Sequence, residues 1–312
     1  MTLEILIAAP IYPATLAALG RLYRAHHLWQ APDRAALLAE LRDKARAIVT
    51  SGGAGADAAL VNAMPKVEII ACFGVGYDAI DLAAAKARNI AVTNTPDVLT
   101  DDVADLALAL ILDSQRRISR GDRYVRAGAW TKGGLELGVA LKGRRLGIVG
   151  LGRIGLATAK RAAACGMAIA YHGPRRKADA PYPYFANLVE LAKDSDVLAL
   201  TLPGGAGTRH LVDAEVLAAL GPQGTLVNVA RGSIVDEAAL VGALQSGALG
   251  AAALDVFEDE PRVPAALVAM ENVVLQPHVG SATHQTRAAM GQLVLDNLAA
   301  HFAGRPLPTR VL

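Results

Sequence analysis

Short apolar runs alternate with amphipathic stretches along the first third of the chain. Four of these runs predict buried strands, at residues 3–9, 46–51, 67–73 and 89–94. Between them, Arg34–Lys44 and Asp81–Arg88 carry helix-forming residues at amphipathic spacing. Strands that alternate with helices predict a parallel sheet that is covered by helices on both faces.

A second alternating series follows a long helix. Apolar residues recur at spacings of three and four between Val103 and Ile111, and Thr100 or Asp101 is placed to cap this helix. Six further strands are predicted, at 145–150, 167–172, 196–203, 224–230, 250–257 and 272–277. They make up a second, doubly wound sheet within residues 100–284. A last amphipathic helix begins near Thr283 and ends at Gly304–Pro306.

Composition narrows the class of protein. The 312 residues suffice for two domains, and 53% hydrophobic with 19% charged residues describes a globular protein. A net charge of +2 and an aromatic share of 4% argue against binding to nucleic acid. No uncharged apolar run approaches the ~18 residues of a membrane span. The apolar N-terminus, which carries Glu4 and no leading basic residue, indicates a first strand and not a signal peptide.

The two cysteines, Cys72 and Cys165, are far apart in sequence and have no CxxC spacing. This pattern predicts neither a disulfide framework nor a zinc site, and it suits a reducing, cytoplasmic location. Cys72 is expected to be a small buried hydrophobic residue and not a nucleophile.

A glycine-spaced turn, "GLGRIG" at Gly150–Gly155, stands between a predicted strand and a predicted helix. In this context Gly150 allows the tight turn, Gly152 allows a pyrophosphate to approach the backbone, and Gly155 allows helix and strand to pack closely. The N-terminus of the helix offers N–H groups and a positive dipole end to phosphates. The turn predicts a dinucleotide site; the alternative is an ordinary glycine-rich connection.

A histidine stands at the position where dinucleotide-binding folds usually carry an acidic residue that binds the ribose. His172 lies 172 − 150 = 22 residues after Gly150, where an Asp or Glu commonly binds the ribose 2′-hydroxyl, and Arg175, Arg176 and Lys177 follow. Without a carboxylate, a 2′-phosphate is not repelled, and Arg175 and Arg176 can hold it by charge-assisted hydrogen bonds. One good contact favours NADPH over NADH by roughly tenfold to a hundredfold. We therefore expect NADP(H), with NAD possible but weaker; a solvated basic loop is the alternative.

Three polar residues follow three late strands. Arg231 comes after "LVNVA", Glu260 after "ALDVF" and His278 after "VVLQP". Ligands of open parallel sheets bind beyond the carboxyl ends of the strands, so these three side chains are expected near the cofactor turn. Taken singly, each could be a surface or structural residue.

The chain resembles the D-isomer-specific 2-hydroxyacid dehydrogenase family, and is similar to its glyoxylate/hydroxypyruvate reductase branch. The matching stretches run in the family's order: "FGVGYDAID", "DDVADLALALIL", "GRRLGIVGLGRIG", "LVNVARGSIVDEAAL", "ALDVFEDEP" and "QPHVGSAT". The resemblance implies two doubly wound α/β domains with a cleft between them: a flavodoxin-like substrate domain at 1–99 and 285–312, and a Rossmann domain at 100–284. It also implies that the last helix returns to the first domain. A homodimer is the default expectation, and Trp130 is expected on the arm that pairs subunits.

The resemblance also implies roles for the site residues. Arg231 would bind the carboxylate of a 2-keto acid and polarise its carbonyl. His278 would be the general acid, and Glu260 would orient the imidazole and favour its charged form. The substrate would also contact the backbone of Val75 and Gly76, together with Ser281. The implied cofactor residues are Gly150, Gly152, Arg153, Ile154, Gly155, Arg175, Arg176, Thr208 and Asp255, of which Asp255 would meet the nicotinamide carboxamide. No metal is expected.

The expected reaction is the NADPH-dependent reduction of a small 2-keto acid, of the glyoxylate or hydroxypyruvate type, to the D-2-hydroxy acid. Phe73 stands in the substrate loop where no cation is present, so an unphosphorylated substrate fits better. Phenylpyruvate, 2-ketogluconate and pyruvate remain alternatives, as does a dinucleotide-sensing binding protein. His26 and His27 are expected on a helix or at its end, where adjacent residues do not share a face.

Overall fold

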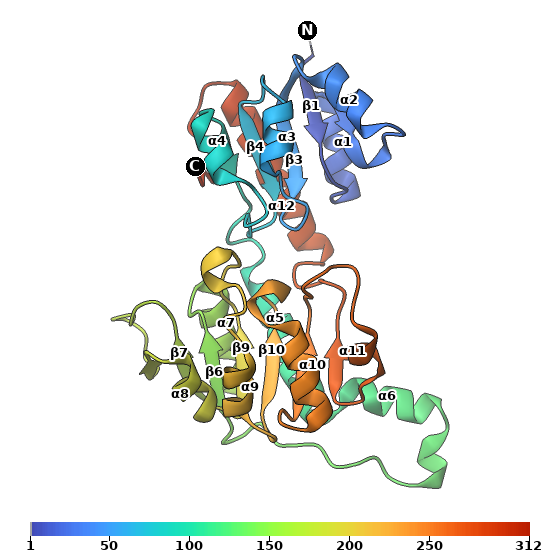
Figure 1. Ribbon diagram of the computed structural model, residues 1–312, viewed down its shortest axis with the longest axis vertical. Helices are drawn as coiled ribbons and strands as arrows, with labels where there is room; N and C mark the ends of the chain where they lie inside the picture. Colours follow the sequence, from blue (N-terminus) through green and yellow to red (C-terminus); the bar gives the residue numbers. More distant parts are fainter. Residues whose placement is uncertain (1) are drawn as a thin grey trace. The chain divides into compact units, whose positions relative to one another are not determined.

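The computed structural model describes residues 2–312, which divide into two compact units. Unit 1 comprises the chain up to Leu99 together with Ser281–Leu312, and unit 2 comprises Thr100–Gly280. The second boundary lies 284 − 280 = 4 residues before the expected one. Each unit consists of a parallel sheet between layers of helices (Figure 1).

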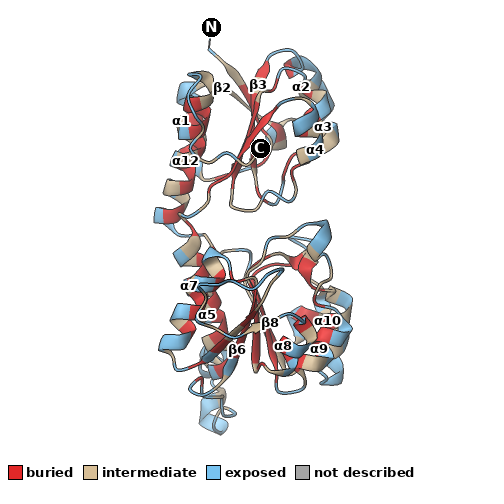
Figure 2. Ribbon diagram, turned by 90° about the vertical axis from the view of Figure 1, so that its left-hand side faces the viewer, coloured by how far each residue is buried: buried red, intermediate tan, exposed pale blue. Residues whose placement is uncertain are grey.

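Unit 1 contains five parallel strands in the order β2-β1-β3-β4-β5, which is the flavodoxin-like order. The strands are β1 (Glu4–Ile7), β2 (Arg24–His27), β3 (Ala45–Ser51), β4 (Ile69–Phe73) and β5 (Ala91–Thr93). The helices are α1 (Pro13–Leu22), η1 (Leu28–Gln30), α2 (Arg34–Leu41), α3 (Ala58–Ala63), α4 (Leu82–Ala87) and α12 (His284–Phe302). Helices α1 and α12 cover one face and α2, α3 and α4 the other, so the central strands are buried on both sides (Figure 2).

Strand β2 corrects the expectation of a helix at His26 and His27. Residues Arg24–His27 pair in parallel with β1 along its full length, at the edge of the sheet. None of the strand's four residues is fully buried. The sequence "RAHH" therefore has no need of alternating apolar residues, and it shows no such alternation. Within this strand, His26 Nε2 lies 2.9 Å from the Glu4 carboxylate. Cross-strand pairing therefore decides the conformation here, and it leaves no trace in the local pattern.

Unit 2 contains seven parallel strands in the order β12-β11-β10-β9-β6-β7-β8. The first six strands along its chain follow the Rossmann order 3-2-1-4-5-6, and β12 extends the sheet at one edge. The strands are β6 (Arg145–Val149), β7 (Ala168–His172), β8 (Tyr184–Phe185), β9 (Val197–Leu200), β10 (Thr225–Asn228), β11 (Ala251–Leu254) and β12 (Val273–Leu275). Only β8 was not expected, since two residues are too short for a readable pattern.

The helices of unit 2 form two layers on its sheet, with α5 and α7 on one face and α8, α9 and α10 on the other (Figure 2). They are α5 (Thr100–Arg116), α6 (Ile118–Arg126), η2 (Ala129–Lys132), α7 (Arg153–Ala164), α8 (Leu188–Lys193), η3 (Ala206–Thr208), α9 (Ala214–Leu220), η4 (Gly232–Ile234), α10 (Glu237–Ser246) and α11 (Ala265–Ala269). Thr100 and Asp101 lie inside the first turn of α5, so neither caps it from outside. No helix within residues 2–312 is long and apolar enough to cross a membrane.

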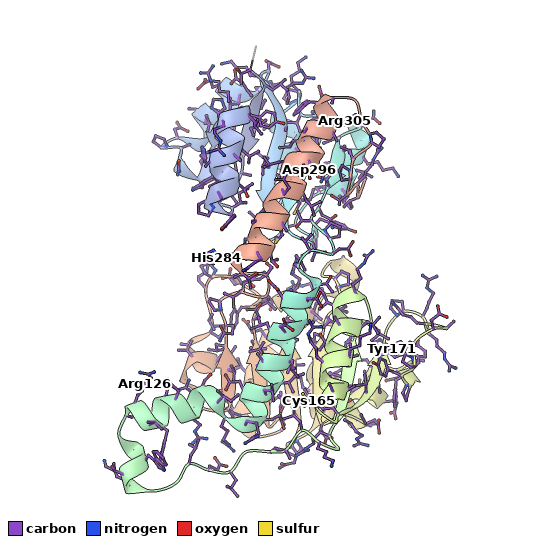
Figure 3. All side chains as sticks on the ribbon, turned by 180° about the vertical axis from the view of Figure 1, so that it is seen from behind. Arg126, Cys165, Tyr171, His284, Asp296 and Arg305 are labelled. Carbon is purple, nitrogen blue, oxygen red and sulfur yellow. The ribbon has the colours of Figure 1, made fainter. Side chains whose placement is uncertain are left out.

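Helix α6 and η2 form an arm that leads away from the sheet of unit 2 (Figures 1 and 3). Neither element contains a buried residue. Trp130 is 69% exposed, Ile118 and Val125 are also exposed, and Leu137, in the segment that follows η2, is 88% exposed. The arm therefore presents large apolar side chains without a covering layer from its own unit.

Candidate active site

Arg231, Asp255 and His278 follow three adjacent strands, β10, β11 and β12, at the same edge of the sheet. The register aligns Asn228 with Leu254 and Leu254 with Leu275, so the three strands end at the same level. Backbone bonds continue beyond the strands: the Asp255 N–H donates to the Asn228 carbonyl, at 2.9 Å, and the His278 N–H donates to the Asp255 carbonyl, also at 2.9 Å. The sheet thus extends its ladder to Asp255, the expected contact of the nicotinamide, and to His278, the expected general acid.

His278 and Glu260 form a hydrogen-bonded pair. The imidazole Nδ1 lies 2.7 Å from Glu260 Oε2, with side-chain exposures of 40% for His278 and 33% for Glu260. Because Nδ1 is occupied by the carboxylate, Nε2 is the nitrogen left to exchange a proton with a ligand. His278 has a φ of 53°, a left-handed conformation that costs a non-glycine residue about 1–2 kcal/mol. Hydrogen bonds from the N–H groups of His278 and Val279 to Asp255 hold the backbone in this conformation.

The electrostatics of Glu260 favour its ionised form. Burial alone would raise its pKa, but the hydrogen bond and charge of His278, the Phe257 N–H and the charge of Arg231 together lower the pKa of Glu260. The Phe257 N–H donates to Glu260 Oε1 at 3.1 Å. A carboxylate at neutral pH is therefore available to stabilise a protonated imidazole.

Arg231 is placed by a turn that the sequence expectations missed. The buried Asn228 side chain accepts the Ala230 N–H at 3.0 Å and donates from Nδ2 to the Arg231 carbonyl at 2.9 Å. The next residue, Gly232, packs on the chain that leads to Glu260: an added Cβ would overlap the backbone of Phe257 and Glu258. An Asn at a strand end, three residues before the arginine, is a readable turn signal.

Asp255 has a clear structural role. It is 1% exposed, and its two carboxylate oxygens accept the N–H groups of Val279 at 2.7 Å and Gly280 at 2.9 Å. Burial raises its pKa, although these hydrogen bonds and His278 oppose the shift. Asp255 thus fixes the backbone directly after His278. Its contact with a nicotinamide carboxamide stays a prediction.

The glycine turn lies at the switch point between β6 and β9. Gly150 has a φ of 92°, and a Cβ there would lie 2.6 Å from Leu202 Cβ; a Cβ on Gly155 would lie 2.7 Å from Thr201 Oγ1. Gly152 differs from both because a Cβ there meets nothing within 4 Å. Gly152 is also the N-cap of α7, without a side-chain hydrogen bond to the helix, and Arg153 and Ile154 are the first helical residues. Open space at a helix N-terminus fits the phosphates of a dinucleotide.

The loop after β7 presents the two arginines. His172 Nδ1 lies 3.0 Å from the Phe185 carbonyl, and the His172 carbonyl accepts the Gly150 N–H at 2.9 Å. Arg175 and Arg176 are exposed, and neither forms an ion pair within residues 2–312. The loop itself is held by Tyr171, labelled in Figure 3, whose hydroxyl accepts the Lys177 N–H at 2.7 Å. Two unpaired guanidinium groups therefore follow the strand that adjoins the turn.

The remaining predicted residues fall in different places. The Thr208 hydroxyl, at the end of η3, donates to the carbonyls of Pro203 and Gly205. Ser281 is the first residue of the segment in which the chain returns to unit 1. Val75 and Gly76 also belong to unit 1, in its first segment. All other predicted site residues belong to unit 2. Within residues 2–312, no three His, Cys, Asp or Glu side chains are grouped to hold a metal ion.

The loop Gly74–Gly76 turns its carbonyls toward buried donors. The Gly74 carbonyl accepts the Thr95 N–H at 2.9 Å, and the Val75 carbonyl accepts Asn94 Nδ2 at 2.9 Å. In a trans peptide the C=O and the following N–H point in opposite directions. The N–H groups of Val75 and Gly76 therefore point away from these buried residues, and neither donates a hydrogen bond within residues 2–312. Two adjacent N–H groups of this kind suit an anion.

Comparison with known proteins decides the family. Residues 108–280 match the model of the D-isomer specific 2-hydroxyacid dehydrogenase NAD binding domain. The chain is 48% identical to hydroxyphenylpyruvate reductase of Plectranthus scutellarioides over 308 residues, which cover 99% of this chain and 98% of that protein. The chain belongs to the D-isomer-specific 2-hydroxyacid dehydrogenase family. It is also 51% identical to glyoxylate/hydroxypyruvate reductase A of Arabidopsis thaliana over 284 residues, 91% of either chain.

A solved structure supports the same branch of the family. NADPH-dependent glyoxylate/hydroxypyruvate reductase of Sinorhizobium meliloti, in complex with NADP and malonate, matches with a TM-score of 0.94 and 44% identity, over 100% of this chain and 97% of that one. The expected fold and the glyoxylate reductase branch of the family are thus confirmed. The chain is a 2-hydroxyacid dehydrogenase with a nicotinamide dinucleotide as its cofactor, and its relatives act on small keto acids.

Proposed function

We propose that this dehydrogenase reduces a small 2-keto acid, of the glyoxylate or hydroxypyruvate type, to the D-2-hydroxy acid with NADPH. The observation that carries the proposal is the hydrogen bond of 2.7 Å between His278 and Glu260, with Arg231 close enough to contribute to the low pKa of Glu260. A general acid, a carboxylate that supports it and a cation for an α-carboxylate are the groups that this reduction requires.

Each of the three residues has a distinct task in the proposed reaction. Arg231 binds the substrate carboxylate and polarises the adjacent carbonyl, since a guanidinium offers two parallel donors. His278 delivers a proton from Nε2 to the carbonyl oxygen, while Nδ1 stays bonded to Glu260. Glu260 keeps the ring oriented and stabilises its protonated form. The bound dinucleotide supplies the hydride.

The preference for NADPH rests on the loop after β7. Arg175 and Arg176 are exposed cations without an ion-pair partner in the described chain, and His172 stands where a carboxylate would repel a 2′-phosphate. The open space at Gly152 and the uncapped N-terminus of α7 suit the pyrophosphate, with Arg153 and Ile154 as donors. Gly150, Gly155 and Thr208 shape the surrounding turns. We also retain Asp255 as the proposed contact of the nicotinamide carboxamide.

The substrate carboxylate is also proposed to bind the outward N–H groups of Val75 and Gly76, and Ser281, in the returning segment of the same unit, is proposed as a further substrate contact. The loop contains no cation of its own, which favours an unphosphorylated keto acid. Phe73 stands directly before the loop, with the Arg287 guanidinium 5.6 Å from the centre of its ring. The similarity to hydroxyphenylpyruvate reductase makes an aromatic keto acid the second candidate.

We further propose a homodimer, in which the arm of α6 and η2 packs against a second copy. The exposed Trp130, Leu137, Ile118 and Val125 provide the apolar material that a stable interface requires. Both cysteines, Cys72 and Cys165, are free thiols, which fits a reducing compartment such as the cytoplasm.

The test is the initial rate of reduction of glyoxylate, hydroxypyruvate and hydroxyphenylpyruvate, each with NADPH and with NADH, followed at 340 nm. We expect the highest kcat/KM with NADPH and one of the first two acids. A higher kcat/KM for hydroxyphenylpyruvate would establish the second candidate. Tight binding of NADPH without turnover of any 2-keto acid would overturn the proposal and favour a dinucleotide-sensing binding protein.

A further inference from the structure

We propose that Asn94 and Thr309 are positioning residues for the substrate: Thr309, in the C-terminal tail, holds Asn94, and Asn94 holds the loop Gly74–Gly76 with its N–H groups outward. The proposal rests on the proposed function, because it assigns a support to the loop that is proposed to bind the substrate carboxylate. All of its contacts lie within unit 1.

Asn94 controls the orientation of one peptide of the loop. It follows β5 and is 8% exposed, and its Nδ2 donates to the Val75 carbonyl at 2.9 Å. That carbonyl belongs to the same peptide as the Gly76 N–H. If the bond were lost, the peptide could rotate and turn the Gly76 N–H away from an anion. Cys72 assists the same loop, because its Sγ lies 3.5 Å from the Gly76 carbonyl.

Thr309 connects Asn94 to the last helix. The Thr309 hydroxyl donates to the Asn94 carbonyl at 2.6 Å and accepts Asn297 Nδ2 at 2.7 Å. The Thr309 N–H donates to Asn297 Oδ1 at 3.2 Å. Asn297 is fully buried on α12, and it also donates to the Leu293 carbonyl. A continuous chain of hydrogen bonds therefore runs from α12 through the tail to the loop.

The tail is a structural part of unit 1. Thr93 and Arg310 form an antiparallel bridge, and the Val311 N–H donates to the Val92 carbonyl at 2.7 Å. The Leu312 carbonyl in turn accepts the Val92 N–H at 3.3 Å. This pairing at the end of β5 fixes the position of Thr309. The hydroxyl of Thr309 is therefore held in place before any substrate binds.

The decisive variant is Thr309→Val, which keeps the shape of the side chain and removes the hydroxyl. We expect KM for glyoxylate, at saturating NADPH, to rise by about fivefold to fiftyfold, because the variant loses both hydrogen bonds of the hydroxyl, to Asn94 and from Asn297, and this loosens the loop. We expect kcat to change by less than about threefold and the Kd of NADPH to be unchanged, since neither depends on this loop.

Two matched variants separate the hydroxyl from a general disturbance of the tail. Thr309→Ser retains the hydroxyl and is expected to restore the wild-type KM. Arg305→Ala alters an exposed residue earlier in the tail, whose side chain forms no hydrogen bond or ion pair within residues 2–312, and is expected to leave KM unchanged. Asn94→Asp, which lacks the Nδ2 donor, provides a second measurement should Thr309→Val fail to fold.

Hydrogen–deuterium exchange of the peptide that covers residues 91–97 gives a readout that needs no activity, because the Thr95 N–H donates to the Gly74 carbonyl of the loop at 2.9 Å and the Asn94 N–H donates to the Thr309 carbonyl at 3.3 Å. We expect faster exchange in Thr309→Val and Asn94→Asp than in the wild type and Arg305→Ala. Unchanged exchange would overturn the proposal, whether or not KM rises. If the wild type reduces no 2-keto acid but exchange still accelerates, the proposed function fails while the support of the loop by Thr309 and Asn94 stands.

Discussion

Two glycines of the dinucleotide turn, Gly150 and Gly152, should respond to the same substitution in opposite ways. A Cβ on Gly152 meets nothing within 4 Å, and the residue has φ −79° and ψ −159°, which any L-amino acid adopts. Gly152→Ala should therefore leave the free energy of unfolding unchanged or raise it by about 0.4–1 kcal/mol, since alanine restricts the unfolded chain. The methyl group instead occupies the space into which the pyrophosphate must move.

Gly152→Ala is expected to weaken the binding of NADPH, whereas Gly150→Ala is expected to lower the free energy of unfolding. Displacing one phosphate from the N-terminus of α7 removes at least one charge-assisted hydrogen bond, so the Kd of NADPH should rise about tenfold to a hundredfold in Gly152→Ala. Gly150→Ala places alanine at φ 92°, with its Cβ 2.6 Å from Leu202 Cβ. That variant should lose about 2–4 kcal/mol of stability from backbone strain and overpacking.

The assay combines urea denaturation of the free proteins with titration of NADPH, followed by the fluorescence of the nicotinamide. We expect Gly152→Ala to unfold at the wild-type urea concentration and to bind weakly, and Gly150→Ala to unfold at a lower concentration. The reasoning is refuted if Gly152→Ala binds NADPH with the wild-type Kd, because the open space would then not be where the phosphates lie. It is also refuted if Gly152→Ala is the least stable of the variants.

His278→Gln should lower kcat at least a hundredfold with the Kd of NADPH nearly unchanged, because general acid catalysis contributes about 10²–10⁴-fold; a variant with substantial activity would exclude His278 as the acid. Replacing Arg175 and Arg176 together by alanine should weaken NADPH binding about tenfold to a hundredfold and NADH binding much less, and equal losses would contradict a 2′-phosphate site. Gly232→Ala should lower kcat/KM about a hundredfold, because its Cβ displaces the loop of Glu260 by roughly 1 Å. The exposed Gly242→Ala is its control, since a Cβ there meets nothing within 4 Å and should not change kcat/KM.

Much of the fold could be predicted from the sequence because buried parallel strands are continuous apolar runs. Each expected strand of either sheet overlaps one in the structure, and Thr283 caps the last helix as the pattern suggests, with its side chain accepting the Thr286 N–H. The pair of His278 and Glu260 was also foreseeable, since both residues follow neighbouring strands. Local pattern and tertiary structure agree at these positions.

Other features depend on contacts that no local pattern reveals. The strand Arg24–His27 is defined by its partner β1, and its polar residues suggest no strand at all. Asn94 and Thr309 are 215 residues apart, and their hydrogen bond exists only because the tail returns to β5. The sequence suggested a nicotinamide contact for Asp255, while the structure shows its carboxylate bound to two backbone N–H groups after His278. Such partners follow from the sheet order, and not from the residue type.

The discontinuity of unit 1 has a consequence for how the protein is made. Unit 2 is complete once Gly280 has been synthesised, whereas unit 1 needs both its first 99 residues and the segment Ser281–Leu312. Translation of the 312 − 99 = 213 intervening and returning residues takes about 10–40 s at the usual rates. During that time the sheet of unit 1 lacks α12 and the tail, so the part of its face that α12 covers has no helix packed on it. Unit 2 is therefore free to fold first, and the Gly74–Gly76 loop acquires its support from Thr309 only after Thr309 has been synthesised.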